Sequence, residues 1–219
     1  MKLLSVNQAR SIWFIKLVDF TRGRSLISMI PSIVNRYKFQ IFPTKPEEFE
    51  LSNGVKFSLG SFQKDQQNMA IDLVIFSDGL VADTKSSTED SDFFLNESLT
   101  WIAVEFGLVP YHEVLRSKVY LSELWVQTDK SLNSLNPKLE SFAKRLTSLI
   151  VGHEHHPISF ETSGINFWSD PIIVNPPGAF RFERAEKAPF GEQRYYSAAP
   201  LQTDVHIEIL SELENILSS

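Results

Sequence analysis

The sequence predicts an α+β protein made of two pseudo-repeated halves, each with the order strand, helix, antiparallel meander, helix. Two observations lead to this expectation. Stretches with the apolar period of a strand alternate with stretches that have the period of a helix, and turn-forming or capping residues separate them. The same order then recurs in the second part of the chain. We expect helices packed on one face of antiparallel sheets, with residues 1–109 and 110–219 as two α+β halves of one compact unit.

The chain begins with a strand pattern and a helix pattern. Residues 11–20 (SIWFIKLVDF) are apolar at both odd and even positions, which is typical of a strand buried on both sides. Ser25 is a candidate helix cap, and apolar residues follow it at helical spacing as far as Tyr37. Pro31 lies inside this stretch, so we expect a kink there or a helix that starts there. Residues 38–42 alternate like a short strand.

Two dipeptides predict the turns of an antiparallel meander. Asn53-Gly54 and Asp78-Gly79 each separate two strand-like stretches, and both dipeptides are preferred in two-residue hairpin loops. Ser87 followed by Asp90 then resembles a capping box, with aspartate in place of the usual glutamate or glutamine. It opens a helix whose apolar residues have helical spacing and which ends at a glycine.

The second half repeats this order with different residues. Residues 117–127 have a strand pattern, and Asn136 precedes a proline at the start of an amphipathic helix. Two pairs of short strands are expected within residues 158–168 and 180–199, and Thr203 is expected to cap a last helix. The layout is similar to the duplicated saddle of TATA-binding proteins, although no motif of that family is present. The similarity therefore implies no function.

Composition and charge argue against several classes of protein. The chain has no cysteine, which excludes disulfides, thiolate zinc sites and a cysteine nucleophile. No apolar stretch approaches the ~18 residues that a membrane span needs, and no signal-peptide pattern is present. The net charge is −6 and neither half is basic, which argues against a broad nucleic-acid surface. We expect a cytoplasmic protein without a membrane or nucleic-acid partner.

A histidine-rich segment, residues 151–160 (VGHEHHPISF), is a candidate metal site. His153 and His155 have the spacing of two zinc ligands on an extended segment. The H-E-x-x-H motif is absent because Pro157 takes the place of its second histidine. Further ligands would have to come from distant residues such as Glu161, His112 or His206. Solvated histidines near the carboxyl end of a helix explain the segment without a metal, and we favour that interpretation.

Residues 71–86 form a second candidate site. A two-residue loop at Asp78-Gly79 would place Asp72 opposite Lys85, with Asp83 on the same face of the hairpin. This set resembles the D…(D/E)-x-K pattern of metal-dependent, restriction-like nucleases. The resemblance implies that Asp72 and Asp83 hold Mg²⁺ and that Lys85 assists the attack of water. The alternative is an ordinary cross-strand ion pair on a solvated face.

Residues 180–204 form a third candidate site, which interleaves basic and aromatic side chains. Arginine and tyrosine are enriched at interface anchors, so Arg181, Arg184, Tyr195 and Tyr196 are candidate binding residues. Glutamates lie between the basic residues, and a ladder of cross-strand ion pairs explains the segment equally simply.

The leading functional prediction is a non-enzymatic interaction or assembly protein, because catalytic motifs are weak while the architecture is well marked. Its partner would be another protein or a second copy of the chain. An Mg²⁺-dependent nuclease-like enzyme that uses Asp72, Asp83 and Lys85 is the first alternative. A small-ligand-binding module is the second. No cofactor is expected except Mg²⁺ under the nuclease alternative.

Overall fold

A computed structural model describes residues 1–150, 159–173 and 176–218 of the 219-residue chain. Within these residues there are eight strands and six α-helices, and the paired strands are antiparallel, so the protein belongs to the α+β class. The strands are β1 (Lys2–Ile15), β2 (Val55–Lys64), β3 (Gln67–Ile75), β4 (Gly79–Thr84), β5 (Leu115–Gln127), β6 (Gly164–Phe167), β7 (Phe180–Arg184) and β8 (Arg194–Ala199). The helices are α1 (Leu17–Thr21), α2 (Ile30–Tyr37), α3 (Thr88–Phe106), α4 (Tyr111–Val114), α5 (Pro137–Leu149) and α6 (Thr203–Ser218).

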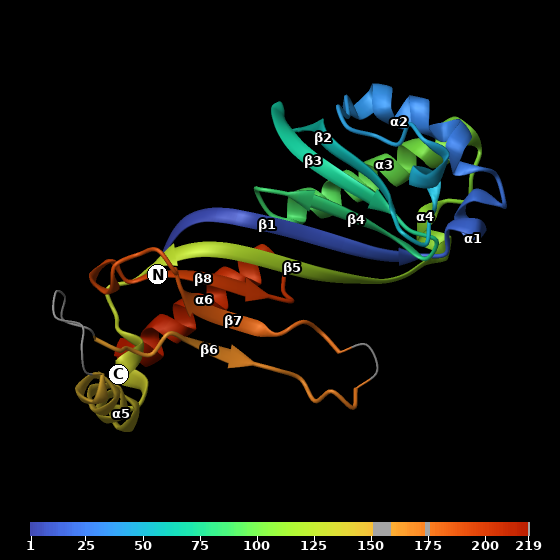
Figure 1. Ribbon diagram of the computed structural model, residues 1–219. Helices are drawn as coiled ribbons and strands as arrows, with labels where there is room; N and C mark the ends of the chain where they lie inside the picture. The colour runs from blue at the N-terminus through green and yellow to red at the C-terminus, as the bar shows by residue number, and fades with distance from the viewer. Residues whose placement is uncertain (151–158, 174–175, 219) are drawn as a thin grey trace. The chain divides into compact units, whose positions relative to one another are not determined.

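The chain folds into two compact units (Figure 1). The larger unit contains Val6–Ser122 and Pro200–Thr203, and the smaller unit contains Met1–Ser5, Glu123–Ala199 and Asp204–Ser219. In the larger unit the strands are hydrogen-bonded in the order β2-β3-β4-β1-β5, and in the smaller unit in the order β1-β5-β8-β7-β6. β1 and β5 thus contribute residues to both units. The expected pseudo-duplication of residues 1–109 and 110–219 stays a prediction.

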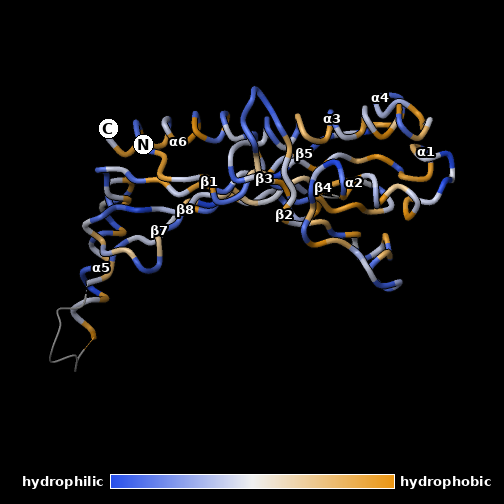
Figure 2. Tube along the Cα trace, turned by 90° about the horizontal axis from the view of Figure 1, so that it is seen from above, coloured by the Kyte–Doolittle hydropathy of each residue, from blue (hydrophilic) through white to orange (hydrophobic). Residues whose placement is uncertain are grey.

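One hydrophobic core joins the strands of the larger unit to helices α2 and α3. Alternate residues of each strand enter it because side chains of a strand point to opposite faces in turn. Tyr37 of α2 and Phe94 of α3 meet edge to face in this core, with ring centroids 4.9 Å apart. Hydrophobic and hydrophilic residues also alternate along α3, as Figure 2 shows. Burial of one face by each element therefore holds this unit together.

The expectation for residues 11–20 is corrected in two respects. β1 ends at Ile15 and helix α1 follows, so the second part of this apolar stretch is helical. Within β1 only alternate residues are fully buried, namely Ala9, Ser11, Trp13 and Ile15, so the strand is not equally buried on both sides. A short apolar run has no period that distinguishes a strand from a helix, which explains the error. Helix α2 begins at Ile30, with Pro31 in its first turn, where a missing N–H is tolerated.

The first hairpin turns at Asp65 and Gln66, not at Asn53-Gly54. Lys64 pairs with Gln67 across a two-residue loop, and both loop residues have a positive φ, 49° and 65°, as a type I′ turn requires. Asn53-Gly54 lies in a turn that leads into β2. The segment before it contains a 3₁₀ helix, η2 (Pro46–Phe49), so there is no strand for β2 to pair with there. The strand expected in residues 38–42 is reduced to one bridge between Ile41 and Ser58.

The hairpin of β3 and β4 has a register that differs from the expected one. Ile75 pairs with Leu80 and Asp72 pairs with Asp83, so the expected pairing of Asp72 with Lys85 is wrong. The chain reverses at Ser77-Asp78, one residue earlier than expected, and the Phe76 N–H donates to the Gly79 carbonyl at 2.8 Å. The carbonyl oxygen of Asp78 accepts a hydrogen bond from the Ile15 N–H, at 3.0 Å, and that of Ser77 accepts one from the Leu17 N–H, at 2.9 Å.

Locally encoded features of the helices are confirmed. The hydroxyl of Ser87 accepts a hydrogen bond from the Asp90 N–H at 3.2 Å, and α3 ends at Gly107 in the left-handed conformation. Asn136 caps α5 by accepting from the Lys138 N–H at 3.0 Å. In the second expected pair of strands, β7 and β8 are present. Of the first pair, β6 is present, and its partner is β7. The described residues of its expected partner, 159–161, are not in a strand.

A polar cluster attaches α3 to β1 and β5 in the larger unit. The carboxylate of Asp92 in α3 accepts hydrogen bonds from the indole of Trp13 at 2.7 Å, from Lys118 at 2.9 Å and from the Tyr120 hydroxyl at 3.2 Å. The Lys118 ammonium also lies 3.8 Å from the centroid of the Trp13 ring. Burial and the charge of Asp92 raise the pKa of Tyr120 to about 12. A single carboxylate thus holds side chains from two strands.

Replacing Asp92 with alanine should lower the free energy of unfolding by about 2–3 kcal/mol, because the partly buried indole N–H and the ammonium lose their acceptor. Urea denaturation monitored by circular dichroism measures the change. Glu105→Ala is the matched control, since Glu105 is an exposed acidic residue of the same helix. Equal stability losses in the two variants would contradict a special role for Asp92.

Candidate functional site

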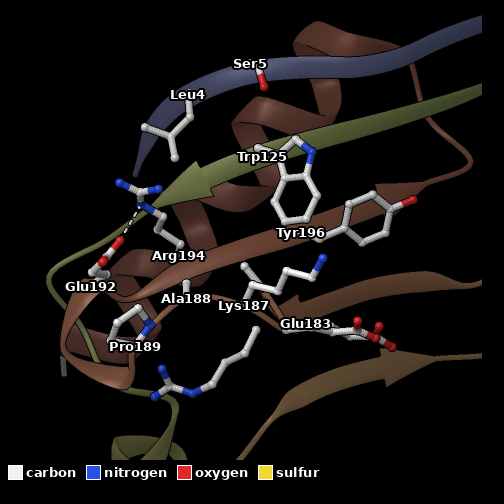
Figure 3. A pocket seen from close by; sticks show the side chains of 13 residues that line it. Leu4, Ser5, Trp125, Glu183, Lys187, Ala188, Pro189, Glu192, Arg194 and Tyr196 are labelled. Atoms are coloured by element: carbon white, nitrogen blue, oxygen red, sulfur yellow. Dashed lines mark ion pairs between the residues drawn. The ribbon is translucent and has the colours of Figure 1, made fainter.

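The smaller unit contains a cavity of about 720 Å³ on the side of its sheet where Trp125 projects (Figure 3). It is lined by β1, β5, β7 and β8 and by the connection between β7 and β8, which includes the 3₁₀ helix η4 (Phe190–Glu192). Its volume lies in the range of small-molecule sites. The lining residues are Leu4, Ser5, Trp125, Glu183, Arg184, Ala185, Glu186, Lys187, Ala188, Pro189, Glu192, Arg194 and Tyr196.

Strand alternation places two aromatic rings in this cavity. Trp125 lies between the buried residues Leu124 and Val126 of β5 and therefore points to the opposite face of the sheet. Tyr196 has the same position in β8, between the buried residues Tyr195 and Ser197. The centroids of the two cavity rings are 5.3 Å apart and the rings are inclined by 60°. Together they form an aromatic wall against which an apolar or planar group can pack.

Charged groups surround the aromatic wall. The guanidinium of Arg194 pairs with the carboxylate of Glu192 at 2.9 Å, shown by the dashed line in Figure 3. Arg184 pairs with Glu161. Burial, followed by the nearby charge of Glu123, raises the pKa of Tyr196 to about 12, so its hydroxyl stays protonated at neutral pH. Aromatic rings with a few fixed polar groups suit the binding of a ligand.

The four residues expected to form a binding site lie in different places. Arg184 and Tyr196 line the cavity, whereas Arg181 does not. Tyr195 is fully buried and stacks on Phe182, with ring centroids 4.4 Å apart. It has no exposed surface for a partner to contact. Arg184 packs over the rings of Phe190 and Tyr195.

The alternative of an ion-pair ladder finds support in two pairs within this region. Arg184 pairs with Glu161 and Arg194 with Glu192. The first pair is the more shielded, because the side chain of Arg184 is only 9% exposed. The Arg184 guanidinium also donates to the Phe190 carbonyl at 3.3 Å, which attaches β7 to the connection that lines the cavity.

The histidines of the metal hypothesis cannot be placed. His153 and His155 lie outside the described residues. Within residues 1–150, 159–173 and 176–218, no group of three or more histidine, aspartate or glutamate side chains is placed to hold a metal ion. Of the more distant candidates, Glu161 pairs with Arg184, and His206 is buried and hydrogen-bonded to the Ser197 hydroxyl at 2.8 Å.

The two carboxylates of the nuclease hypothesis have structural partners. Both carboxylates are on one face of the sheet, since Asp72 pairs with Asp83. Asp83 accepts two hydrogen bonds from the guanidinium of Arg10, at 2.7 and 2.8 Å. Asp72 accepts from the Leu59 N–H at 2.8 Å, at the irregularity in β2. Lys85 lies beyond the end of β4 and is exposed, so it is not the cross-strand neighbour of Asp72.

Trp125 was missed as a site residue. Its signal in the sequence was the pattern Leu124, Trp125, Val126. In a strand the tryptophan of this pattern points to one face of the sheet and its two apolar neighbours point to the other. The sequence predicts the strand that contains Trp125, but it does not indicate which face of that strand is buried. The contribution of Leu4 had no signal, because it depends on a neighbouring strand far away along the chain.

Comparisons with known proteins assign the chain to no family. No family model matches the chain, and no curated protein is significantly similar to it. Among the described residues, none of the helices combines the length and the apolar character that crossing a membrane requires.

Buried His206 should make stability depend on pH. Burial lowers its pKa from 6.5 to about 4, so between these values the unfolded chain binds the proton more strongly. Its contribution to stability is complete above pH 6.5 and is lost as the pH falls toward 4, by up to about 3 kcal/mol. Urea denaturation between these pH values measures the slope. The slope should be smaller in His206→Gln and unchanged in His112→Gln, where the replaced histidine is exposed. A wild-type slope in His206→Gln would contradict this assignment.

Proposed function

We propose that the protein acts by binding another protein through the β6–β7 arm, defined as residues 164–173 and 176–184. In Figure 1 the chain continues as extended segments beyond the ends of β6 and β7. The observation that supports the proposal is the exposure of large apolar side chains on this arm. Phe167 is 64% exposed, Trp168 73% and Ile172 86%. A group of exposed apolar residues on one segment is typical of an interaction surface.

Local contacts give the arm a defined conformation. The rings of Phe167 and Phe180 have their centroids 5.9 Å apart across the two strands. Asp170 forms a turn, because its carboxylate accepts from the Ile172 N–H at 2.9 Å and its carbonyl accepts from the Ile173 N–H at 3.1 Å. Preformed turns reduce the entropy lost on binding.

The composition of the arm also fits a binding surface. The Arg181 guanidinium lies 5.7 Å from the centroid of the Trp168 ring. Tryptophan and arginine are the residue types most enriched among the energetically dominant residues of interfaces. Under this proposal Arg181 contacts the partner directly. Arg184 and Tyr195 hold the base of the arm instead, through Glu161, Phe190 and Phe182.

The double substitution Trp168→Ser and Ile172→Ser should abolish binding to the protein partner, because it removes two exposed apolar anchors. Its free energy of unfolding should stay within about 0.5 kcal/mol of the wild type, since both side chains are exposed. The measurement has two stages. Cross-linking with mass spectrometry identifies chains bound by the wild type and not by the variant, and calorimetric titration of the purified partner gives its affinity.

Val104→Ser is the control, because Val104 of α3 is 81% exposed but lies outside the arm. It should bind the partner as the wild type does. Equal partner binding by the arm variant and the wild type would refute the role of the arm.

A small-ligand-binding module is the second candidate, and the aromatic cavity of the smaller unit favours it. Trp125→Ala should weaken the binding of the fluorescent probe 8-anilinonaphthalene-1-sulfonate by about tenfold, because an aromatic contact and its buried area are lost. The arm variant Trp168→Ser is the control and should keep the affinity. If the probe binds Trp125→Ala as tightly as the wild type, the cavity is not its site.

Strand order supports the proposed pseudo-duplication. Outward from β1 the hydrogen-bonding order of the strands is β4, β3, β2, and outward from β5 it is β8, β7, β6, so each series runs in reverse sequence order. A long helix follows the last strand of each series, α3 after β4 and α6 after β8. We therefore keep the two α+β halves, residues 1–109 and 110–219, as a proposal. The cytoplasmic setting also stays a proposal, supported by the lack of cysteine.

A further inference from the structure

We propose that the outer edge of β6 pairs with the β6 of a second copy of this chain, in an antiparallel register centred on Asn166. The inference rests on the proposed function, and it specifies one occupant for part of the β6–β7 arm. It follows from a comparison of the two strands that end the hydrogen-bonding order, β2 and β6. An edge strand offers unpaired backbone groups to another chain unless it is protected.

The edge strand β2 is protected in several ways. The backbone of Ser58 exchanges hydrogen bonds with that of Ile41, at 3.2 and 2.8 Å, which covers part of its outer edge. The register shifts between Phe57 and Gly60, and Leu59 has a left-handed conformation with φ 56°. The strand also carries lysines at positions 56 and 64. Bulges, lysines and covering segments are the devices that prevent a strand from being added.

Among the described residues, β6 shows no bulge, no lysine and no covering segment. Its sequence, GINF, contains no charged residue and no proline, and its pairing with β7 is regular. In the part of the chain that the structure describes, no strand pairs with its other edge. Large apolar residues at its end, Phe167 and Trp168, are 64% and 73% exposed.

Backbone alternation identifies the groups that face outward from β6. The carbonyl of Ser163 accepts a hydrogen bond from the Arg184 N–H at 2.7 Å, so Ser163 directs its backbone groups toward β7. In an antiparallel ladder this direction reverses at each residue. The N–H and C=O groups of Gly164 and Asn166 therefore point away from β7 and are available to an added strand, and the same alternation extended one residue past the end of β6 gives Trp168 the same direction.

A twofold axis at Asn166 uses all three of these residues. Asn166 then lies opposite Asn166 of the second copy, and Gly164 lies opposite Trp168. Glycine has no side chain, which leaves room for the indole. On the other face Ile165 lies opposite Phe167, a pair of β-branched and aromatic residues that stabilises antiparallel strands.

A second copy is favoured over other extended chains by this complementarity. The pairing sets a small residue against a large one, and it brings no two like charges together because the strand is neutral. It also covers the exposed side chains of Phe167 and Trp168 in both copies. A closed, isologous contact of this kind leaves no β6 edge free for further addition.

The test places charges on the twofold axis. Asn166→Lys and Asn166→Asp should each weaken self-association by about tenfold or more, because two like charges face each other across the axis. An equimolar mixture of the two variants should restore the dimer, since lysine then faces aspartate. Sedimentation velocity over a range of concentrations measures the self-association of each variant and of their mixture. Asn166 is exposed, and thermal denaturation verifies that both variants stay folded. Gln63→Lys, at an exposed position of β2, is the matched control and should dimerise as the wild type does.

A wild-type chain that is monomeric at about 100 µM would overturn the inference, and so would a folded pair of variants whose mixture stays monomeric. Either result leaves the proposed function standing if the substitution of Trp168 and Ile172 still abolishes binding to another protein. If that substitution changes neither self-association nor partner binding, the proposed function fails as well.

Discussion

The hydrogen bond from the Trp13 indole to Asp92 ties helix α3 to the sheet of the larger unit. Among the described residues Trp13 is the largest fully buried side chain, and it belongs to β1, which lies between β4 and β5 in the hydrogen-bonding order. Its N–H needs an acceptor once it is removed from water. Asp92 of α3 supplies the acceptor, and the same carboxylate also binds Lys118 and Tyr120 of β5. The position of α3 is therefore coupled to both strands.

Features that depend on neighbours in the chain could be predicted from the sequence. The caps formed by Ser87 and Asn136 and the end of α3 at Gly107 involve residues a few positions apart, so their signals are local. The hairpin at Asp65 and Gln66 had a weaker signal, because glutamine stands at the second loop position, where a type I′ turn usually has glycine. The register of β3 and β4 also escaped prediction. Its turn lies at Ser77-Asp78, and the carbonyls of these two residues accept hydrogen bonds from the distant residues Leu17 and Ile15, which no local pattern signals.

The candidate site could be predicted in composition but not in geometry. The sequence indicated that tyrosine and arginine are concentrated between residues 180 and 204. It did not indicate that the two adjacent tyrosines have opposite environments, with Tyr195 in the core and Tyr196 in the cavity. Which face of a strand is buried depends on the element that packs against it, and for β8 that element includes α6, whose His206 is hydrogen-bonded to Ser197. Trp125 was overlooked for the same reason.

The irregularity in β2 has a consequence for which residues can occupy position 60. A Cβ atom added to Gly60 would lie 2.4 Å from the ring of Phe39, which is much closer than two carbon atoms can approach. Phe39 in turn packs against Phe57 and Tyr37 in the core. Any larger residue at position 60 would therefore displace an aromatic ring that bridges β2 and α2. Position 60 therefore favours glycine for as long as Phe39 keeps its place.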